Sequence, residues 1–348
     1  MTVSGDIPRA IAGRLHAALE GLETQRRQIA GATAALCGQL VLLALDWGLA
    51  PGSFGKPVFA IVLGLSGAAA LMRYSAGRWR QMVNQTVVPV MADGLGGMVA
   101  RFRDDVFGLA SLPTIGRLFE PAPLVDLGRA FGLGLLPSAN EAWADWTLAG
   151  EHRSLPFTVA GAVRQWQSGM SRNRRTRRSH HLLVSIAVPI PFQGRTLIAR
   201  DGGPLLEKLG ALFDAALPQP GSPGRLAFPH EAFESRFSVR TDDPAEARRL
   251  ITPGVADGLM AIDEAYPDQS VRAAFHAGRL WMALDLPGPL MQQAELFRPA
   301  LAVQSRLQEL ADELTLPHRL IDHLHGGPDQ EPGQRDDAPS KGADLSPE

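Results

Sequence analysis

Five arginines stand close together near the middle of the chain and form its strongest local charge. They are Arg172, Arg174, Arg175, Arg177 and Arg178, within the sequence SRNRRTRRSHH. Beside a membrane, each such charge attracts anionic lipid headgroups by about 1 kcal/mol. An acidic protein partner or RNA could meet the same charges, but no aromatic side chain alternates with the arginines as base stacking requires. A solvated loop tip without a ligand is the remaining interpretation.

Histidines and carboxylates are the other side chains that could do chemistry. His180 and His181 are adjacent, so in a strand they face opposite sides and cannot easily share one metal ion. His318 and Asp322 stand four residues apart and would share a helix face, where a polar helix end explains them without a metal. The acidic turn at 242–246 suits a helix cap and a local ion pair better than acid–base catalysis. We therefore predict no catalytic, cofactor-binding or metal-ligating residue.

Composition and motifs narrow the function classes further. Cys37 is the one cysteine, which excludes an intrachain disulfide and a cysteine-based metal site. The formal net charge of -2 gives no general affinity for nucleic acid. The chain contains no G-x-S-x-G, phosphate-binding loop, dinucleotide fingerprint or H-E-x-x-H. These absences favour a binding role over an enzyme of a familiar type.

Two apolar stretches near the N-terminus, at about 29–49 and 57–76, predict a transmembrane helical hairpin. No charge lies between Ile29 and Leu45, and Ser66 is the most polar residue between Val58 and Met72. In hydrocarbon the backbone must bond to itself, so apolar runs of about 20 residues become helices that cross the bilayer. Their glycines and alanines would let the two helices approach closely. Two buried helices of a soluble core, or a cleaved signal peptide, are the alternatives.

Basic residues at the ends of this hairpin predict its orientation. The residues that flank the two stretches are Arg9, Arg14, Arg26 and Arg27 before the first, and Arg73, Arg78 and Arg80 after the second. The turn between them carries only Asp46 and Lys56. Because positive residues stay on the cytoplasmic side, both termini and the bulk of the chain are expected in the cytoplasm.

The rest of the chain predicts an α+β fold with antiparallel hairpins and a long C-terminal helix. We expect a cytoplasmic amphipathic helix at 1–28, a helical connector at 77–150, a soluble α+β domain at 151–315 and a disordered tail at 326–348. The strand patterns predict hairpins that join 155–163 to 181–192, 181–192 to 195–200, and 271–276 to 279–286. The first of these hairpins carries the arginine cluster at its tip. Helices are expected at 204–217 and 291–312.

One block resembles a known family. Residues 233–262 are similar to the best-marked block of the DUF3137 family of bacterial membrane proteins. The residues that carry the likeness are Phe233, Phe237, Asp242, Asp243, Glu246, Ala247, Arg248, Thr252 and Pro253, with Phe192, Gly194 and Thr196 in an earlier turn. The resemblance implies two N-terminal spans in a bacterial inner membrane, and it brings no catalytic residues.

Together these observations predict a membrane-anchored cytoplasmic module that binds or scaffolds at the bacterial inner membrane. Its expected partners are the membrane itself, anionic lipid headgroups and an unidentified protein, with no cofactor and no specific nucleic acid. One alternative is an enzyme with an unrecognised active site in the soluble domain. Another is an accessory subunit of a membrane transport complex, although Gln39 is the one strongly polar side chain within the stretches Ile29–Leu45 and Val58–Met72.

Overall fold

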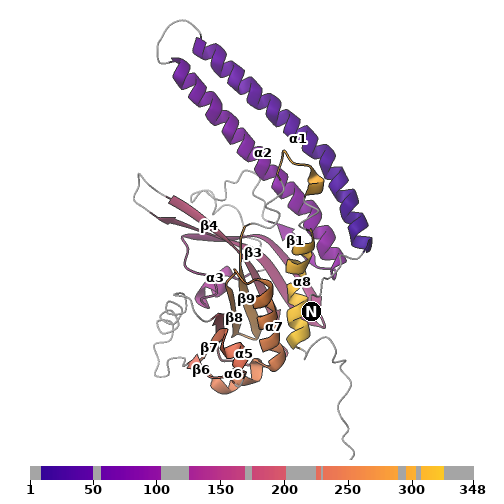
Figure 1. Cartoon of the computed structure of the whole chain (residues 1–348), viewed down its shortest axis with the longest axis vertical. Coiled ribbons are helices and arrows are strands. Elements are labelled where there is room, and N and C mark those ends of the chain that lie inside the picture. The colour runs from indigo at the N-terminus through magenta and orange to yellow at the C-terminus, as the bar shows by residue number, and fades with distance from the viewer. Residues whose placement is uncertain are drawn as a thin grey trace, which may run out of the picture.

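A long two-helix stem projects from an α/β domain in the computed structural model (Figure 1). The structure describes residues 9–49, 56–102, 125–168, 175–200, 225–228, 230–288, 295–302 and 307–324. The predicted fold class is confirmed, because two long apolar helices precede an antiparallel sheet and a helix closes the described part of the chain. The predicted tail at 326–348 and the predicted helix at 204–217 lie outside the described residues.

The stem consists of α1 (Arg9–Leu49) and α2 (Lys56–Gly94). Both helices are long and apolar enough to cross a membrane. Its outer half exposes large apolar side chains, which are Leu36, Leu40, Leu42, Leu43, Leu45, Trp47, Val58, Phe59, Ile61, Val62, Leu63, Leu65 and Met72. We call this surface the apolar belt. An uncovered belt of this length is unfavourable in water and suits hydrocarbon.

Small and polar contacts join the two helices within the belt. A Cβ atom built on Gly64 would lie 2.5 Å from the Cβ atom of Ala44, so the glycine allows the backbones to approach. The Thr33 hydroxyl donates to the Ser75 hydroxyl at 2.9 Å, and both side chains are buried. These contacts replace the hydrophobic driving force that helices lose in lipid.

The base of the stem is a bundle that belongs to the domain core. Ile11, Leu15, Leu19 and Leu22 of α1 are buried against an apolar stripe on α2. Trp79 lies in that stripe and is 1% exposed, so its ring is part of the core. Helix α1 therefore runs without a break from this buried base into the apolar belt, and the apolar face of its N-terminal part packs against the C-terminal part of α2.

The domain is built on an antiparallel sheet, which has nine strands within the described residues, in the order β1-β2-β3-β4-β9-β8-β5-β7-β6. The strands are β1 (Val99–Phe102), β2 (Glu141–His152), β3 (Leu155–Ser168), β4 (Arg175–Ala187), β5 (Thr196–Arg200), β6 (Arg225–Leu226), β7 (Phe237–Thr241), β8 (Val271–His276) and β9 (Arg279–Leu286). The helices of the domain are α3 (Leu127–Gly132), α5 (Glu231–Glu234), α6 (Pro244–Leu250), α7 (Pro253–Ala265) and α8 (Leu307–Leu324).

Each face of the sheet has its own core. On the first face, Val159, Val184 and Met282 belong to one large cluster with α7, α8 and the base of the stem. The second face carries a smaller cluster, in which Leu183 and Trp281 share a core with α3. The first face thus connects the sheet to the stem. The second face packs against a smaller set of apolar side chains.

Several elements differ from those that the sequence predicts. Within the described part of 77–150, α2 continues across Pro89 to Gly94, and strand β1, the short helix α3 and strand β2 follow. Strands β4 and β5 do not form a hairpin, because β4 pairs with β9 while β5 pairs with β7 and β8. The last helix is α8 at 307–324 and not 291–312. The hairpins β3–β4 and β8–β9 are confirmed.

We expect Gly64→Val to separate the two stem helices, because the new side chain meets Ala44 and Leu40 at contact distances too short to relax. Cys37, which lies against α2 with its thiol 3.6 Å from the Ala68 carbonyl oxygen, should then react faster with N-ethylmaleimide in detergent micelles. Gly31→Val is the control, because nothing lies within 4 Å of a Cβ atom on Gly31. Equal labelling rates in the two variants would contradict close packing at Gly64.

Candidate functional site

The arginine cluster lies at the end of the β3–β4 hairpin that rises beside the stem (Figure 1). Arg172 and Arg174 fall outside the described residues, and Arg175 begins β4. Arg177 and Arg178 are exposed. Their partners in the strand register are Trp166 and Gln165, so the paired strands hold two exposed guanidinium groups at this end of the sheet.

Adjacent arginines on β4 face opposite sides of the hairpin. Arg178 donates from Nε to Gln165 Oε1 at 2.8 Å, and its guanidinium lies 5.8 Å from the Trp143 ring centroid. Arg177 pairs across the strands with Trp166, which Arg164 covers at 4.5 Å. Both sides of the hairpin end therefore carry positive charge beside an aromatic ring. Such contacts hold the arginine side chains in place without neutralising them.

The two histidines that follow the cluster face opposite ways, as predicted. Burial, with the neighbouring charges of His181 and Arg178, lowers the pKa of His180 to about 4. His181 is 1% exposed and takes part in a polar network on the second face of the sheet. The histidine pair does not form a metal site, and no group of three metal-ligating side chains occurs among the described residues.

The polar network is centred on a buried arginine. Arg272 is 2% exposed and donates to the Leu135 carbonyl oxygen and to both oxygens of Asp285, at 3.2 and 3.1 Å. Burial opposes ionisation of Asp285, but the His181 hydrogen bond and the charge of Arg272 outweigh it and lower the pKa of the carboxyl. A buried guanidinium requires such a partner, because an unpaired buried charge is strongly destabilising.

The network continues from Asp285 to a serine. His181 Nδ1 lies 2.7 Å from Asp285 Oδ1, and His181 Nε2 lies 2.9 Å from Ser179 Oγ. This connectivity is that of a serine–histidine–aspartate triad. Arg164 Nε also donates to the same hydroxyl at 3.0 Å, which withdraws electron density from it. The two arginines give these contacts a structural explanation. Asp285 compensates the charge of Arg272, and Ser179 accepts a hydrogen bond from Arg164.

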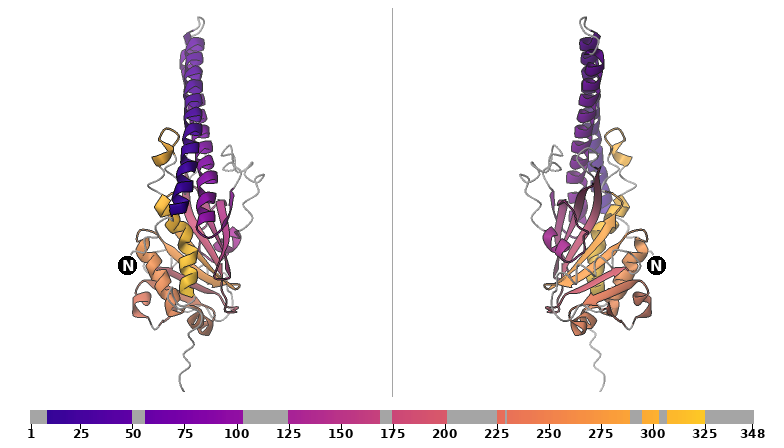
Figure 2. Two further views of the ribbon diagram at one scale, coloured as in Figure 1. Left: turned by 90° about the vertical axis from the view of Figure 1, so that its right-hand side faces the viewer. Right: turned by 90° about the vertical axis from the view of Figure 1, so that its left-hand side faces the viewer.

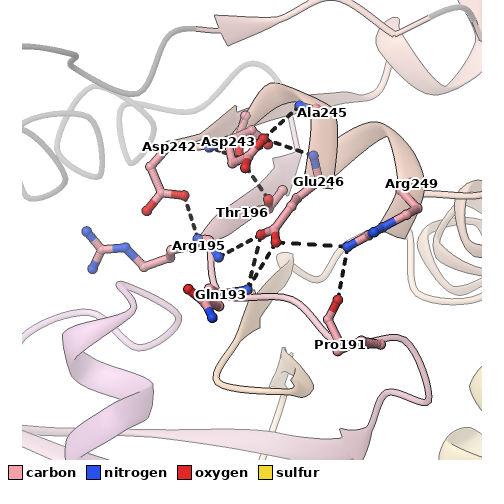
Figure 3. Close-up of polar contacts among 11 residues, drawn as sticks. Pro191, Gln193, Arg195, Thr196, Asp242, Asp243, Ala245, Glu246 and Arg249 are labelled. Carbon is pink, nitrogen blue, oxygen red and sulfur yellow. Dashed lines mark hydrogen bonds and ion pairs between the residues drawn. The ribbon is translucent and has the colours of Figure 1, made fainter.

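The acidic turn at 242–246 ties a loop of the sheet to the start of α6 (Figure 3). Glu246 accepts from the backbone N–H of Gly194 at 2.7 Å and from that of Gln193 at 3.2 Å. Asp242 accepts from the Arg195 N–H at 2.6 Å. Three successive backbone N–H groups form a nest that could bind an anion, but the chain's own carboxylates fill it.

The same turn caps its helix. Asp243 accepts from the N–H groups of Ala245 and Glu246 at 2.9 and 3.0 Å, and Pro244 is the first residue of α6. Thr252 caps α7 in the same way, through the N–H of Val255. The predicted capping role of this block is therefore confirmed, and its carboxylates have structural partners.

The histidines near the C-terminus join α8 to the β2–β3 turn. Asp322 Oδ1 lies 2.9 Å from His152 Nε2 and 2.8 Å from Arg153 Nε. His318 stacks on His152 with ring centroids 4.6 Å apart. Burial and the charge of His152, opposed by Asp322, lower the pKa of His318 and keep it neutral at physiological pH. His318 and Asp322 thus share a helix face, as predicted, and they use it for packing.

Sequence reasoning missed the buried network. The signal that was present is a charged residue inside each of two apolar strands, Arg272 in VRAAFH and Asp285 in RLWMALDL. Opposite charges in neighbouring strands indicate a cross-strand pair. Ser179 and His181 alternate on β4 and point to the same face, but only the three-dimensional pairing of β4 with β9 brings them to Asp285.

We expect Glu246→Gln to lower the stability of the full chain in detergent by about 1–3 kcal/mol, because two backbone N–H groups lose a charged acceptor. The thermal unfolding midpoint, followed by circular dichroism, measures the loss. Glu264→Gln is the matched control, since that carboxylate forms an exposed ion pair with Arg236 that contributes little. Similar midpoints for the two variants would show that the filled nest does not stabilise the fold.

Comparison with known proteins gives a family and one solved structure. Residues 182–325 match the sequence model of a family described as "Protein of unknown function (DUF3137)". No curated protein matches the chain. The crystal structure of the mycobacterial trehalose monomycolate transport factor A, TtfA, is similar over 71% of this chain and 95% of that chain, with 8% identity and a TM-score of 0.30. A TM-score of this size does not establish a common fold.

The family match begins at Leu182 in β4 and runs to the residue after α8. It contains the filled nest, the caps of α6 and α7, and the Arg272–Asp285 pair, whereas the arginine cluster and Ser179 lie before it. The resemblance that the sequence shows is therefore confirmed over residues 182–325, the part of the chain that matches the DUF3137 family model.

Proposed function

We propose that this protein is a membrane-anchored binding module of the bacterial inner membrane, with its domain in the cytoplasm. The observation that supports the proposal most strongly is the apolar belt on the outer half of the stem, which continues without a break into helices buried in the domain core. A surface of that kind is suited to lipid, and its base is suited to hold a soluble domain at a fixed position beneath the bilayer.

Charge supports the orientation. The basic residues that flank the belt stand on the domain side of the stem, and they are Arg26, Arg27, Arg73, Arg78 and Arg80. The far end carries Asp46 and Lys56. By the positive-inside rule the domain side is cytoplasmic. Arg73 lies at the end of the second span, where its long side chain can reach the headgroups.

The arginine cluster is the proposed contact site of this module, for anionic headgroups of the inner leaflet. Arg177 and Arg178 are exposed at the end of a hairpin that rises on the stem side of the domain (Figure 1). Arg172, Arg174 and Arg175 stand beside them in the sequence. Several arginines near an anionic surface attract it additively, and salt weakens the attraction. An acidic segment of a protein partner, including a membrane transport complex, is the alternative ligand of the same charges.

A labelled Thr176→Cys variant in a Cys37→Ala background tests the proposal, because Thr176 is exposed within the cluster. In intact cells, a membrane-impermeant maleimide should fail to reach this position until the inner membrane is opened. In nanodiscs, an environment-sensitive dye at this position should shift to the blue with phosphatidylglycerol present and not in pure phosphatidylcholine. High salt should reverse the shift, because it screens exposed charges.

An Asp257→Cys variant is the control, because Asp257 is an exposed residue of α7 in the same domain. Its dye should not respond to lipid charge. The double change Arg177→Gln and Arg178→Gln should weaken the Thr176→Cys response. Labelling of either position from outside intact cells would overturn the cytoplasmic orientation, and a response that ignores lipid charge would overturn the headgroup contact.

A second candidate function is acyl transfer, and the Ser179–His181–Asp285 contacts are the specific observation in its favour. Ser179 Oγ would attack an ester or thioester carbonyl while its proton passes to His181 Nε2 and then to the leaving group. The candidate ranks second because Arg164 donates to the attacking oxygen and reduces its nucleophilicity.

A fluorophosphonate probe tests the second candidate on the detergent-solubilised full chain. The candidate requires covalent labelling that Ser179→Ala abolishes and that Ser185→Ala retains, because Ser185 lies on the same strand and bonds to Arg279 instead. Since Arg164 holds the Ser179 hydroxyl, we expect the wild-type chain to remain unlabelled. Labelling at Ser179 would overturn that expectation and make the protein an enzyme.

A further inference from the structure

Residues 295–302 lie against the stem, far from the elements that precede and follow them in the domain. In Figures 1 and 2 this short orange-yellow segment stands out beside α1, above the sheet. Leu296 and Ala300 are 2% exposed and belong to the core that includes the base of the stem. We call residues 295–302 the docked segment.

A charged clamp holds the docked segment to α1. Glu23 accepts from the Ala300 N–H at 2.8 Å, and Arg26 donates from Nη1 to the Leu296 carbonyl oxygen at 2.9 Å. Arg26 also forms a bidentate ion pair with Glu23, in which Nε donates to Oε2 at 2.9 Å and Nη2 donates to Oε1 at 2.7 Å. The side chains of Glu23 and Arg26 are only 18% and 12% exposed, so the clamp is largely shielded from water.

The clamp stays charged under ordinary conditions. The Arg26 hydrogen bond, followed by the Ala300 N–H, lowers the pKa of Glu23 to about 2. Glu23 is thus ionised throughout the physiological pH range and continues to accept the hydrogen bond from the Ala300 N–H. The docked segment is a fixed part of the stem and not a loop that happens to pass it.

The clamp fixes the height of the docked segment along the stem. Arg26 and Glu23 precede Ile29, the first residue of the expected span, by three and six positions. At 1.5 Å per residue these positions lie roughly 4.5 and 9 Å before the span. The headgroup region on each side of the hydrocarbon is about 5–8 Å thick. Relative to the expected span, Arg26 thus falls within the headgroup layer and Glu23 close to its outer boundary, and the docked segment that both residues hold lies between these levels.

The outward side of this segment is apolar. Phe297 is 55% exposed and Leu301 is 41% exposed. Among the described residues, large exposed hydrophobic side chains outside the stem occur only here and at Val99. Arg26 and Arg27 on α1 both pair with Glu23, so the clamp retains one net positive charge next to this apolar surface. This combination is typical of segments that lie in a membrane interface.

We propose that Phe297 and Leu301 insert into the cytoplasmic interface of the bilayer, so that the docked segment is a second point of membrane contact beside the spans. The proposal rests on the membrane anchoring proposed above. Lipid is favoured over another occupant because the apolar pair lies next to the lower end of the expected span and because basic side chains adjoin it. Glu23 and Arg26 position the pair and do not themselves enter the lipid.

Nitroxide labels on the full chain in nanodiscs test this contact. In a Cys37→Ala background, labels are placed at Phe297→Cys, at Leu42→Cys in the apolar belt and at Asp257→Cys on α7. Power saturation compares the access of oxygen, which concentrates in lipid, with that of a water-soluble nickel complex. We expect the Phe297→Cys label to show an oxygen-to-nickel ratio severalfold above that of Asp257→Cys and below that of Leu42→Cys.

The outcomes separate the two proposals. A Phe297→Cys label as open to nickel as Asp257→Cys, while Leu42→Cys stays open to oxygen, overturns interfacial insertion and leaves the anchor intact. A Leu42→Cys label open to nickel overturns the anchor and the insertion together. Spin–spin broadening at Phe297→Cys would show that a second copy covers the segment, which also overturns the insertion.

The clamp supplies a second measurement. Glu23→Gln should reduce the oxygen-to-nickel ratio of the Phe297→Cys label, because the segment loses its hold on α1 at this height. Glu20→Gln is the matched control, since Glu20 is an exposed residue of the same helix and forms an ion pair with His16. Equal ratios in the two variants would show that the clamp does not set the depth of the segment.

Discussion

The arrangement of this protein depends on a single apolar core that the base of the stem shares with the first face of the sheet. Trp79, Val83 and Met91 of α2 belong to the same cluster as Val159 and Met282 of the strands. Close packing transmits position, since interdigitated side chains resist sliding. A domain joined in this way cannot swing freely on its stem as it would on a flexible linker. The position of every surface group of the domain relative to the stem therefore follows from the fold.

Charged groups in the domain support that arrangement more than they prepare chemistry. Glu246 and Asp242 fill a nest of backbone N–H groups, Asp285 compensates the buried Arg272, and Glu23 holds the docked segment. The donors at Gly194, Arg272 and Ala300 are partly or fully buried, and a buried donor without a partner costs more than a hydrogen bond contributes when it is made. A carboxylate whose oxygens already accept hydrogen bonds from the protein has little capacity left to act on a substrate.

The sequence predicts what is local and misses what is brought together over long distances. Apolar length predicts the two stem helices, and the Thr252–Pro253 and Asp243–Pro244 pairs predict where α6 and α7 begin, because caps depend on neighbouring residues. The pairing of β4 with β9 joins residues about a hundred positions apart, and no local pattern encodes it. The short apolar strand at 196–200 pairs equally well with several partners on pattern alone, so the predicted hairpin with β4 was wrong. The sequence shows the arginine cluster as a run of charge. Its position on the stem side of the domain follows only from the pairing of β3 with β4 in the sheet.

Because the stem is rigidly joined to the domain, the elements of the domain lie at fixed distances along the stem axis. The end of the β3–β4 hairpin and the docked segment lie towards the stem, on different sides of it, while β6, β7, α5 and α6 form the end farthest from it (Figure 1). Two contacts on different sides of one axis resist tilting, which a contact on one side does not. In the proposed membrane arrangement, a domain supported in this way would keep its far end at a fixed distance from the bilayer. A partner that binds there would then meet a surface of fixed orientation, so less rotational freedom would be lost on binding.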